Sequence, residues 1–267
     1  MKNNILNFIP ERPSKPRKKG VNMMMDKGLS IREVEDFISV AGEYTDFAKL
    51  GFGTSMVMNG IIETKIKLYK EANIKVYLGG TLFEAFIIRD KLDEYKRLID
   101  KLKVDAIEVS DGSILMDHDV KCNYISQLSK THTVLSEVGS KEAGIITAPN
   151  KWIQMMQSEI DAGSSFVIAE ARESGTVGIY RPNGNAHVSL VTKITSKIDK
   201  DKILWEAPLK SQQVWFIKEF GCNVNLGNIA PNEIIPLETL RIGLRGDTFF
   251  QFLPDEFQKL KIKPKAK

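Results

Sequence analysis

Eight short apolar runs, each followed by an amphipathic stretch, recur along this chain of 267 residues. The runs have the composition of buried strands, and in the stretches between them apolar residues return every three or four positions, as on one face of a helix. The predicted strands cover residues 21–26, 47–52, 74–78, 106–110, 133–138, 165–169, 203–206 and 224–226. Strands separated by helices pair in parallel, and eight such units in one chain favour a closed (β/α)₈ barrel over an open doubly wound sheet. We therefore predict an α/β protein with a single TIM-barrel domain.

The starts of the intervening helices carry recognisable signals. Ser30 followed by Glu33, and Thr81 followed by Glu84, have the spacing of a capping box, which satisfies free backbone N–H groups of a first turn. Further helices are predicted over residues 60–72, 92–102, 120–130, 150–162, 211–220 and 232–244. No Gly-x-Gly-x-x-Gly motif follows an early strand, so a dinucleotide site is not indicated. The segment 172–186 has the length and glycine content of an active-site loop.

Positive charge is concentrated at the two ends of the chain. Lys and Arg number 38 against 34 Asp and Glu, a formal charge of +4, and many of these bases lie near the termini. We predict a basic N-terminal arm (1–19) that is solvated and disordered, a barrel (20–253) and a basic C-terminal tail (254–267). The middle of the chain is near neutral, so neither nucleic acid nor a membrane is expected as a partner.

Cysteine use and hydropathy bear on the compartment. Cys122 and Cys222 lie in unrelated segments without metal-ligand spacing, so we expect free core thiols rather than a disulfide or a zinc site. The chain has no apolar run of about 18 residues, and its first residues include charges and prolines where a signal peptide needs an apolar segment. The cytoplasm is the expected location.

Acidic side chains recur at the predicted carboxyl ends of four consecutive strands, the place where TIM barrels carry their chemistry. These residues are Glu108, Glu137, Glu170 and Glu206. Carboxylates gathered at one mouth repel one another unless a cation joins them, and oxygen ligands without Cys or His suit Mg²⁺. We predict that the four glutamates hold Mg²⁺. The alternative is a network of salt bridges to Lys49, Arg172 and Lys210.

Several other residues are candidates for binding an anionic substrate. The turns "GFGTS" and "GGT" can present backbone N–H groups to an anion, and a guanidinium suits bidentate contact with phosphate, sulfonate or carboxylate. The predicted contacts are Lys49, Thr54, Ser55, Arg172, Lys210, Arg241 and Arg245.

Lys141, four residues after Glu137, is the best candidate for proton transfer. The three histidines, His118, His132 and His187, fall in segments predicted to lie away from the strand ends. Nearby cations or partial burial can bring the pKa of a lysine toward neutrality, and a Schiff base is also open to it.

Nine blocks of sequence, each at a predicted strand end or in the turn after it, resemble the phosphosulfolactate synthase family. The blocks are DKGL (26–29), DFAKLGFGTS (46–55), KVYLGGTLFE (75–84), IEVSDGS (107–113), SEVGSK (136–141), EARESG (170–175), WEAPLKSQQ (205–213), NVNLGNI (223–229) and ETLRIGLRGDTF (238–249). The resemblance spans roughly residues 20–250. It implies a (β/α)₈ barrel and Mg²⁺-dependent addition of sulfite to phosphoenolpyruvate, giving (2R)-2-phospho-3-sulfolactate.

The resemblance also implies roles for residues. The family's proposed acid is a lysine just after the fifth strand, which matches Lys141, and Glu137 would then help to hold the metal region. Ser140 stands where family members can carry a second lysine. A homo-oligomer is expected, with a trimer as the state that the resemblance suggests. Plant proteins associated with heat stress are similar as well, so a stress-related barrel with little or no turnover is one alternative, and a lysine-type aldolase using Lys141 is another.

Overall fold

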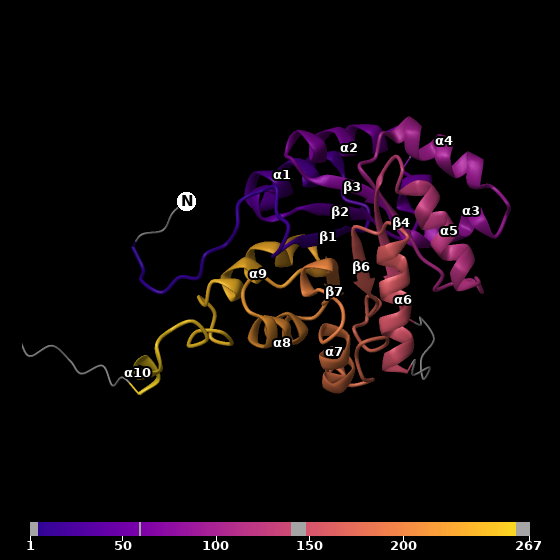
Figure 1. The fold of residues 1–267 in the computed structure, drawn as a ribbon. Coiled ribbons are helices and arrows are strands. Elements are labelled where there is room, and N and C mark those ends of the chain that lie inside the picture. The colour runs from indigo at the N-terminus through magenta and orange to yellow at the C-terminus, as the bar shows by residue number, and fades with distance from the viewer. Residues whose placement is uncertain (1–4, 59, 140–147, 260–267) are drawn as a thin grey trace, which may run out of the picture.

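Eight parallel strands close into a barrel in which each strand pairs with its neighbours in sequence and β8 pairs with β1 (Figure 1). The structure, a computed structural model, describes residues 5–58, 60–139 and 148–259. The strands are β1 Asn22–Asp26, β2 Phe47–Leu50, β3 Lys75–Leu78, β4 Ala106–Val109, β5 Thr133–Val138, β6 Phe166–Ala169, β7 Ile203–Glu206 and β8 Leu226–Ile229. The predicted TIM barrel is confirmed.

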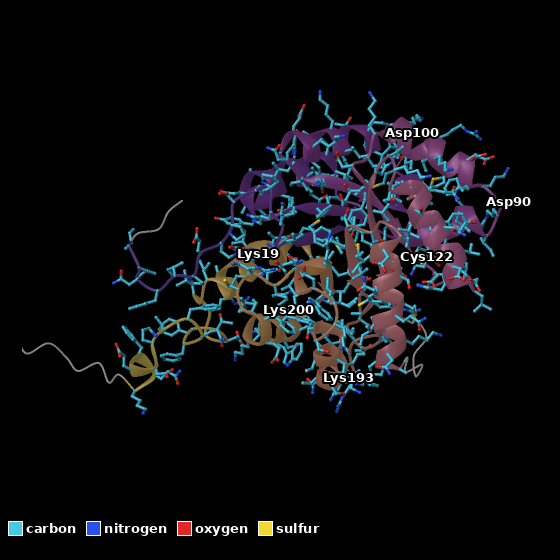
Figure 2. The ribbon with its side chains drawn as sticks, in the orientation of Figure 1. Lys19, Asp90, Asp100, Cys122, Lys193 and Lys200 are labelled. Carbon is cyan, nitrogen blue, oxygen red and sulfur yellow. The ribbon has the colours of Figure 1, made fainter. Side chains whose placement is uncertain are left out.

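Helices pack around the outside of this barrel (Figure 1). They are α1 Ile31–Ala41, α2 Ile62–Glu71, α3 Gly80–Ile87, α4 Leu92–Leu102, α5 His118–Leu128, α6 Pro149–Asp161, α7 Val188–Thr195, α8 Lys210–Phe220, α9 Ile234–Arg241 and α10 Asp255–Gln258. Short 3₁₀ turns lie at η1 Gly42–Tyr44, η2 Thr54–Met56, η3 Lys200–Lys202 and η4 Pro231–Glu233. Charged side chains such as Asp90, Asp100 and Lys193 extend from the outer elements into solvent (Figure 2).

Two apolar layers stabilise the fold. The alternation of side chains along each strand sends one set inward and the other toward the helices. In β5 and β7, Leu135 and Leu204 fill the inside of the barrel, while Val134 and Ile203 pack in the layer against the helices. The strands are buried on both faces, as expected for parallel sheets.

The two predicted capping boxes have different outcomes. The Ser30 side chain accepts a hydrogen bond from the Glu33 N–H, and the Glu33 carboxylate accepts one from the Ser30 N–H, so this box is confirmed. The box at Thr81 and Glu84 is wrong, because α3 starts two residues earlier than that spacing requires, with Gly79 as its N-cap. The buried carboxylate of Glu84 instead accepts hydrogen bonds from Ser113 N (2.6 Å) and Ser110 Oγ.

The eighth strand lies later in the sequence than predicted. Residues 226–229 include Gly227 and Asn228, which resemble a turn, but Gly227 is part of β8. A Cβ at this glycine would lie 2.8 Å from the terminal methyl of Met23, so a larger residue would have to displace that side chain in the barrel interior. Asn225, which lies inside the predicted strand, therefore precedes β8, and its side-chain oxygen accepts a hydrogen bond from Val21 N at the N-terminal end of the barrel.

The described part of the predicted N-terminal arm, residues 5–19, is only partly solvated: Lys18 and Lys19 are exposed, but three other bases contact the barrel. Arg12 forms an ion pair with Glu238 at 2.8 Å, and Arg17 forms one with Asp46 at 3.0 Å, with 4% of the Arg17 side chain exposed. Lys15 donates to the carbonyls of Gly42 and Ala72. Arg12, Lys15 and Arg17 thus dock at the N-terminal end of the barrel, because buried carboxylates and carbonyls there need donors.

Both cysteines are free, as predicted, but Cys122 and Cys222 are half-buried rather than core residues. Within the described ranges, none of the helices combines the length and the apolar character that a membrane span requires.

Candidate active site

A cavity of about 750 Å³ opens at the carboxyl ends of the strands, a size typical of small-molecule sites. Its lining comes from all eight strands or the turns after them: Met25, Lys49, Gly51, Phe52, Gly79, Gly80, Thr81, Glu108, Ser113, Glu137, Glu170, Arg172, Glu173, Ser174, Glu206 and Asn228. All three histidines are described, and none of them lines the cavity. This outcome agrees with the prediction that they lie away from the strand ends.

The ionisable residues of the cavity follow from the strand pattern. Glu137 lies two residues after Leu135, and Glu206 two residues after Leu204, so both glutamates point inward above the apolar interior. In β2, Lys49 likewise lies two residues after Phe47, whose side chain packs in the barrel interior, so Lys49 also points inward. The last inward position of a strand is thus where the core stops and the cavity begins.

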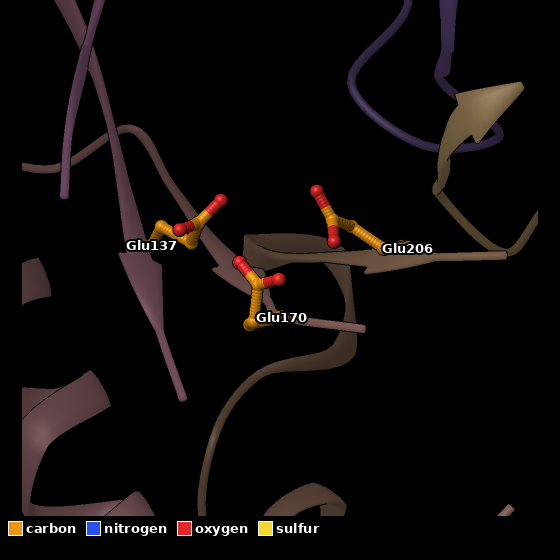
Figure 3. Close-up of side chains that lie close together, drawn as sticks. All are labelled: Glu137, Glu170 and Glu206. Atoms are coloured by element: carbon orange, nitrogen blue, oxygen red, sulfur yellow. The ribbon is translucent and has the colours of Figure 1, made fainter. Parts of the chain in front are cut away.

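Three of the four predicted metal ligands lie together. Oxygens of Glu137, Glu170 and Glu206 lie within 4.8 Å of one another, and the three carboxyl groups face a common space (Figure 3). All three residues are buried. The prediction that carboxylates converge at the ends of the fifth, sixth and seventh strands therefore agrees with the geometry.

Backbone N–H groups orient these carboxylates. Ala171 N donates to Glu206 Oε2 at 2.9 Å, and Arg172 N donates to Glu170 Oε1 at 2.7 Å. Both donors belong to the turn that follows β6. Because this turn bonds two of the three glutamates, its conformation fixes how their carboxyl groups present themselves to the cavity.

Glu108, the fourth predicted metal ligand, has a different partner. Its Oε1 accepts from Gly80 N at 2.6 Å, and its Oε2 lies 2.8 Å from Lys49 Nζ. Lys49 Nζ is also 3.8 Å from Glu137 and 3.8 Å from Glu206. The alternative of a salt-bridge network is thus realised, but only through Lys49, which was predicted as a substrate contact.

Among the described residues that line the cavity, five glutamates stand against Lys49 and Arg172. Burial raises the pKa of Glu206 to about 7, with Glu137 and Glu108 adding to the effect against the opposing charge of Lys49. Burial also raises the pKa of Glu108. Burial by itself lowers the pKa of the Lys49 ammonium. The nearby carboxylates of Glu108, Glu137 and Glu206 outweigh this effect, so the pKa of Lys49 is raised. Lys49 therefore stays protonated among the three glutamates whose oxygens lie within 3.8 Å of its Nζ.

The donor set fits a hard divalent cation. Glu137, Glu170 and Glu206 offer carboxylate oxygens and no sulfur or imidazole, the ligand type that Mg²⁺ and Mn²⁺ prefer. A cation held here would also offset the repulsion that raises the pKa of Glu206.

We predict that metal binding at this group depends on pH through Glu206. The pKa of Glu206 rises from 4.5 to about 7 on folding. The protonated Glu206 therefore contributes its full share to the free energy of unfolding of the metal-free protein below pH 4.5, and this share is lost as the pH rises to about 7. A cation must displace this proton, so Mn²⁺ affinity should rise about tenfold per pH unit up to pH 7 and then level off. Electron paramagnetic resonance of free Mn²⁺ between pH 5.5 and 8 measures this dependence. A flat profile in the wild type, or the same slope in Glu206→Gln, would contradict it.

The predicted anion contacts are dispersed. Arg172 lines the cavity and is exposed. Thr54 and Ser55 lie in η2 and are not part of the cavity lining, and the Thr54 hydroxyl donates to Gly51 O. Lys210 pairs with Asp247 at 2.9 Å on the surface, and Arg245 is half-buried outside the lining.

Arg241 is at the wrong end of the barrel for substrate binding. It is fully buried and donates to the carbonyls of Cys222 and Val224 and to the Asn22 side chain. These partners precede β8 or start β1. A helix that follows a strand returns the chain to the N-terminal end of the barrel, and Arg241 is the last residue of α9.

Backbone strain marks three cavity residues, of which only Arg172 was predicted as a site residue. Phe52, Arg172 and Asn228 have φ of 55°, 51° and 55° and all line the cavity. Residues other than glycine rarely adopt this left-handed conformation, and such residues cluster at functional sites. Asn tolerates this conformation well, so Asn228 of β8 could have been predicted, whereas nothing in the sequence marks Phe52.

Lys141, the predicted proton donor, lies outside the described residues. Gly139 is the last described residue before it and has a φ of 141°. A Cβ at Gly139 would lie 2.6 Å from the Glu170 Cβ, so the chain leaves β5 in close contact with this glutamate.

Comparison with known proteins gives consistent matches over most of the chain. The family described as (2R)-phospho-3-sulfolactate synthase matches residues 10–247. Phosphosulfolactate synthase of Methanothermobacter thermautotrophicus is 39% identical over 251 residues, which cover 92% of this chain and 97% of that protein. The enzyme of the same name from Methanocaldococcus jannaschii is 42% identical over 237 residues, covering 86% and 94%. Protein HEAT-STRESS-ASSOCIATED 32 of Arabidopsis thaliana is 21% identical over 268 residues, covering 86% and 88%.

Proposed function

Since this chain belongs to the phosphosulfolactate synthase family, we propose that it adds sulfite to phosphoenolpyruvate, with Mg²⁺ as cofactor, to form (2R)-2-phospho-3-sulfolactate. The observation that carries this proposal is the group of three buried carboxylates, Glu137, Glu170 and Glu206, at the floor of an open cavity. Both reactants are anions, and a cavity with an excess of carboxylates repels them unless a cation is bound.

The residues of the chain divide into those that would hold the cation and those that would meet the substrates. Glu137, Glu170 and Glu206 would hold Mg²⁺, which when bound supplies positive charge to the carboxylate oxygens of phosphoenolpyruvate. Arg172, exposed at the cavity, is the anion contact that the geometry favours. Lys49 is engaged by Glu108 and serves to neutralise the floor of the cavity.

The reaction itself needs one new bond and one proton. The lone pair of the sulfite sulfur attacks the methylene carbon, a carbon–sulfur bond forms, and the electrons of the double bond move toward the substrate carboxylate. A proton must then reach the carbon that bears the phosphate. We propose Lys141 as its source, supported by its place two residues after Gly139, which contacts Glu170.

The direct test is to incubate the purified protein with sulfite, phosphoenolpyruvate and Mg²⁺ and to look for a sulfonated phosphoester by mass spectrometry and ³¹P NMR. We expect product, loss of activity on exhaustive chelation, and recovery when Mg²⁺ or Mn²⁺ is restored. Reactions without sulfite, or with pyruvate in place of phosphoenolpyruvate, are the controls. Full turnover after chelation would contradict the metal role, and no product under any condition would contradict the reaction.

A second candidate is a stress-related barrel with a different activity or none. The 21% identity to Protein HEAT-STRESS-ASSOCIATED 32 supports it, but identities of 39% and 42% to the two synthases favour the enzyme. The cavity with its glutamates is compatible with either candidate, so the assay above decides between them.

We further propose that the chain forms a homo-oligomer and works in the cytoplasm. Exposed aromatic side chains near both ends support an association surface: Phe8 packs edge-on against Phe257 at 5.5 Å, and Phe249 against Phe250 at 5.2 Å. The two free cysteines suit a reducing compartment.

A further inference from the structure

A buried ionic cluster lies behind β5, in the layer between the strands and the helices. Lys121 of α5 and Glu159 of α6 are both fully buried, and Lys121 Nζ lies 2.8 Å from Glu159 Oε1. Elsewhere this layer is mainly apolar. Burying a charged pair costs free energy that apolar residues of similar volume would not cost, so the pair is weak evidence for stability and calls for another role.

The contacts of Lys121 point to the candidate metal group. Besides Glu159, its ammonium donates to Asp111 Oδ1 at 3.0 Å, in the turn after β4, and to the backbone carbonyl of Glu137 at 2.5 Å. The side chain of Glu137 belongs to the three-carboxylate group inside the barrel. One ammonium on the outside of the barrel therefore bonds the main chain of a residue whose side chain lies inside.

The strand register explains why this carbonyl needs a donor from a side chain. The last paired residues of β4 and β5 are Val109 and Ser136, so Glu137 extends one residue beyond the end of the pairing. The next carbonyl, that of Val138, faces β6 and accepts from Glu170 N at 3.0 Å. Successive carbonyls point to opposite neighbours, so that of Glu137 faces β4, where the strand has ended, and Lys121 takes the place of the missing strand donor.

We propose that Lys121 is a positioning residue that holds the main chain of Glu137 and thereby sets its carboxylate against Glu170 and Glu206. Glu159 and Asp111 hold the ammonium in place from two other elements. This inference rests on the proposed metal site. Partners that orient ligands typically change metal affinity about 10- to 100-fold when they are removed.

The chain offers a matched control. Lys65 of α2 is also fully buried and lies 2.8 Å from Asp26 Oδ2 at the end of β1, but neither residue belongs to the three-carboxylate group. Lys65→Met together with Asp26→Asn removes a buried pair of the same kind. Its cost to folding should resemble that of Lys121→Met together with Glu159→Gln, so the two pairs separate a loss of stability from a loss of metal affinity.

The test measures Mn²⁺ affinity by electron paramagnetic resonance and the urea midpoint for each variant. We expect Lys121→Met, alone and with Glu159→Gln, to raise the Kd for Mn²⁺ about 10- to 100-fold. The Lys65 and Asp26 pair should change it less than about twofold. If Lys121→Met alone does not fold, the double variant decides, because the carboxylate that then still lacks Lys121 is that of Asp111, which is partly exposed, and not the fully buried Glu159.

Two results would overturn the positioning role while leaving the metal site intact: a folded Lys121 variant with the wild-type Kd, or equal weakening by both pairs. Absence of Mn²⁺ binding in the wild type is a different failure. It would overturn the metal site, and this inference with it, whereas the product assay would still report on the reaction.

Discussion

Replacing Lys141 with alanine is expected to lower the turnover of sulfite addition by about 10² to 10⁴-fold while the protein stays folded, the range typical for loss of a general acid. None of the histidines lines the cavity, and the ammonium of Lys49 is paired with Glu108. Neither a histidine nor Lys49 is therefore expected to supply the proton when Lys141 is replaced. The KM for phosphoenolpyruvate should change little, because the proton is needed only after the carbon–sulfur bond forms. Steady-state kinetics with both reactants measure the separation of kcat from KM.

The control for this variant is Lys151→Ala. Lys151 is an exposed lysine in the first turn of α6, ten residues further along the chain, and should have near-normal kinetics. Near-normal turnover in Lys141→Ala, with sulfonate still formed, would show that Lys141 is a bystander. Borohydride with pyruvate tests the aldolase alternative, since a Schiff base would be trapped on Lys141 of the wild type and on no lysine of the variant.

The barrel and its acidic floor were predictable from local patterns. Strand and helix periods are visible in single segments, and parallel strands of one barrel must end at a common mouth. Glutamates at the last inward-facing position of β5 and β7 therefore had to meet. The distance between their carboxyl groups depends on how the barrel closes, and no feature of the two sequence segments by themselves predicts it.

The partners of individual side chains were less predictable. Glu108 and Glu137 carry the same sequence signal, yet Lys49 lies 2.8 Å from the first and 3.8 Å from the second, a difference set by strand register. Lys121 looked like an ordinary helix residue, because its contact with the Glu137 carbonyl depends on where β4 ends. Long-range contacts of this kind have no trace in the local sequence.

Arg241 shows a different failure. Its guanidinium suited an anion, but the geometry of a strand–helix unit already places the end of α9 at the far side of the barrel. The residue type was weighed above its position in the repeat. A stricter use of the repeat would have excluded Arg241, and it would have kept Arg172, which directly follows the end of β6.

Glu137→Gln is expected to reduce metal-dependent turnover about 10² to 10³-fold, because loss of a ligand carboxylate removes several kcal/mol of charge stabilisation and each 1.4 kcal/mol is a factor of ten. The effect on the metal-free protein should have the opposite sign. Glu137 raises the pKa of both Glu108 and Glu206, so its neutral replacement relieves repulsion among buried carboxylates. Without metal, the variant should unfold at a temperature no lower than the wild type at pH 7.5, and Mg²⁺ should stabilise it less.

Glu173→Gln is the matched control for that experiment. Glu173 also lines the cavity, but it lies at the exposed rim, paired with Lys27, and is not part of the three-carboxylate group. Its replacement removes the same charge from the same cavity and should leave the Mg²⁺ requirement and the Mg²⁺-induced rise in Tm unchanged. Equal losses in both variants would mean that the cavity acts through its overall charge. A Glu137→Gln variant with wild-type Mg²⁺ dependence would remove Glu137 from the metal site, because the loss of one of three ligands must weaken the binding of the ion.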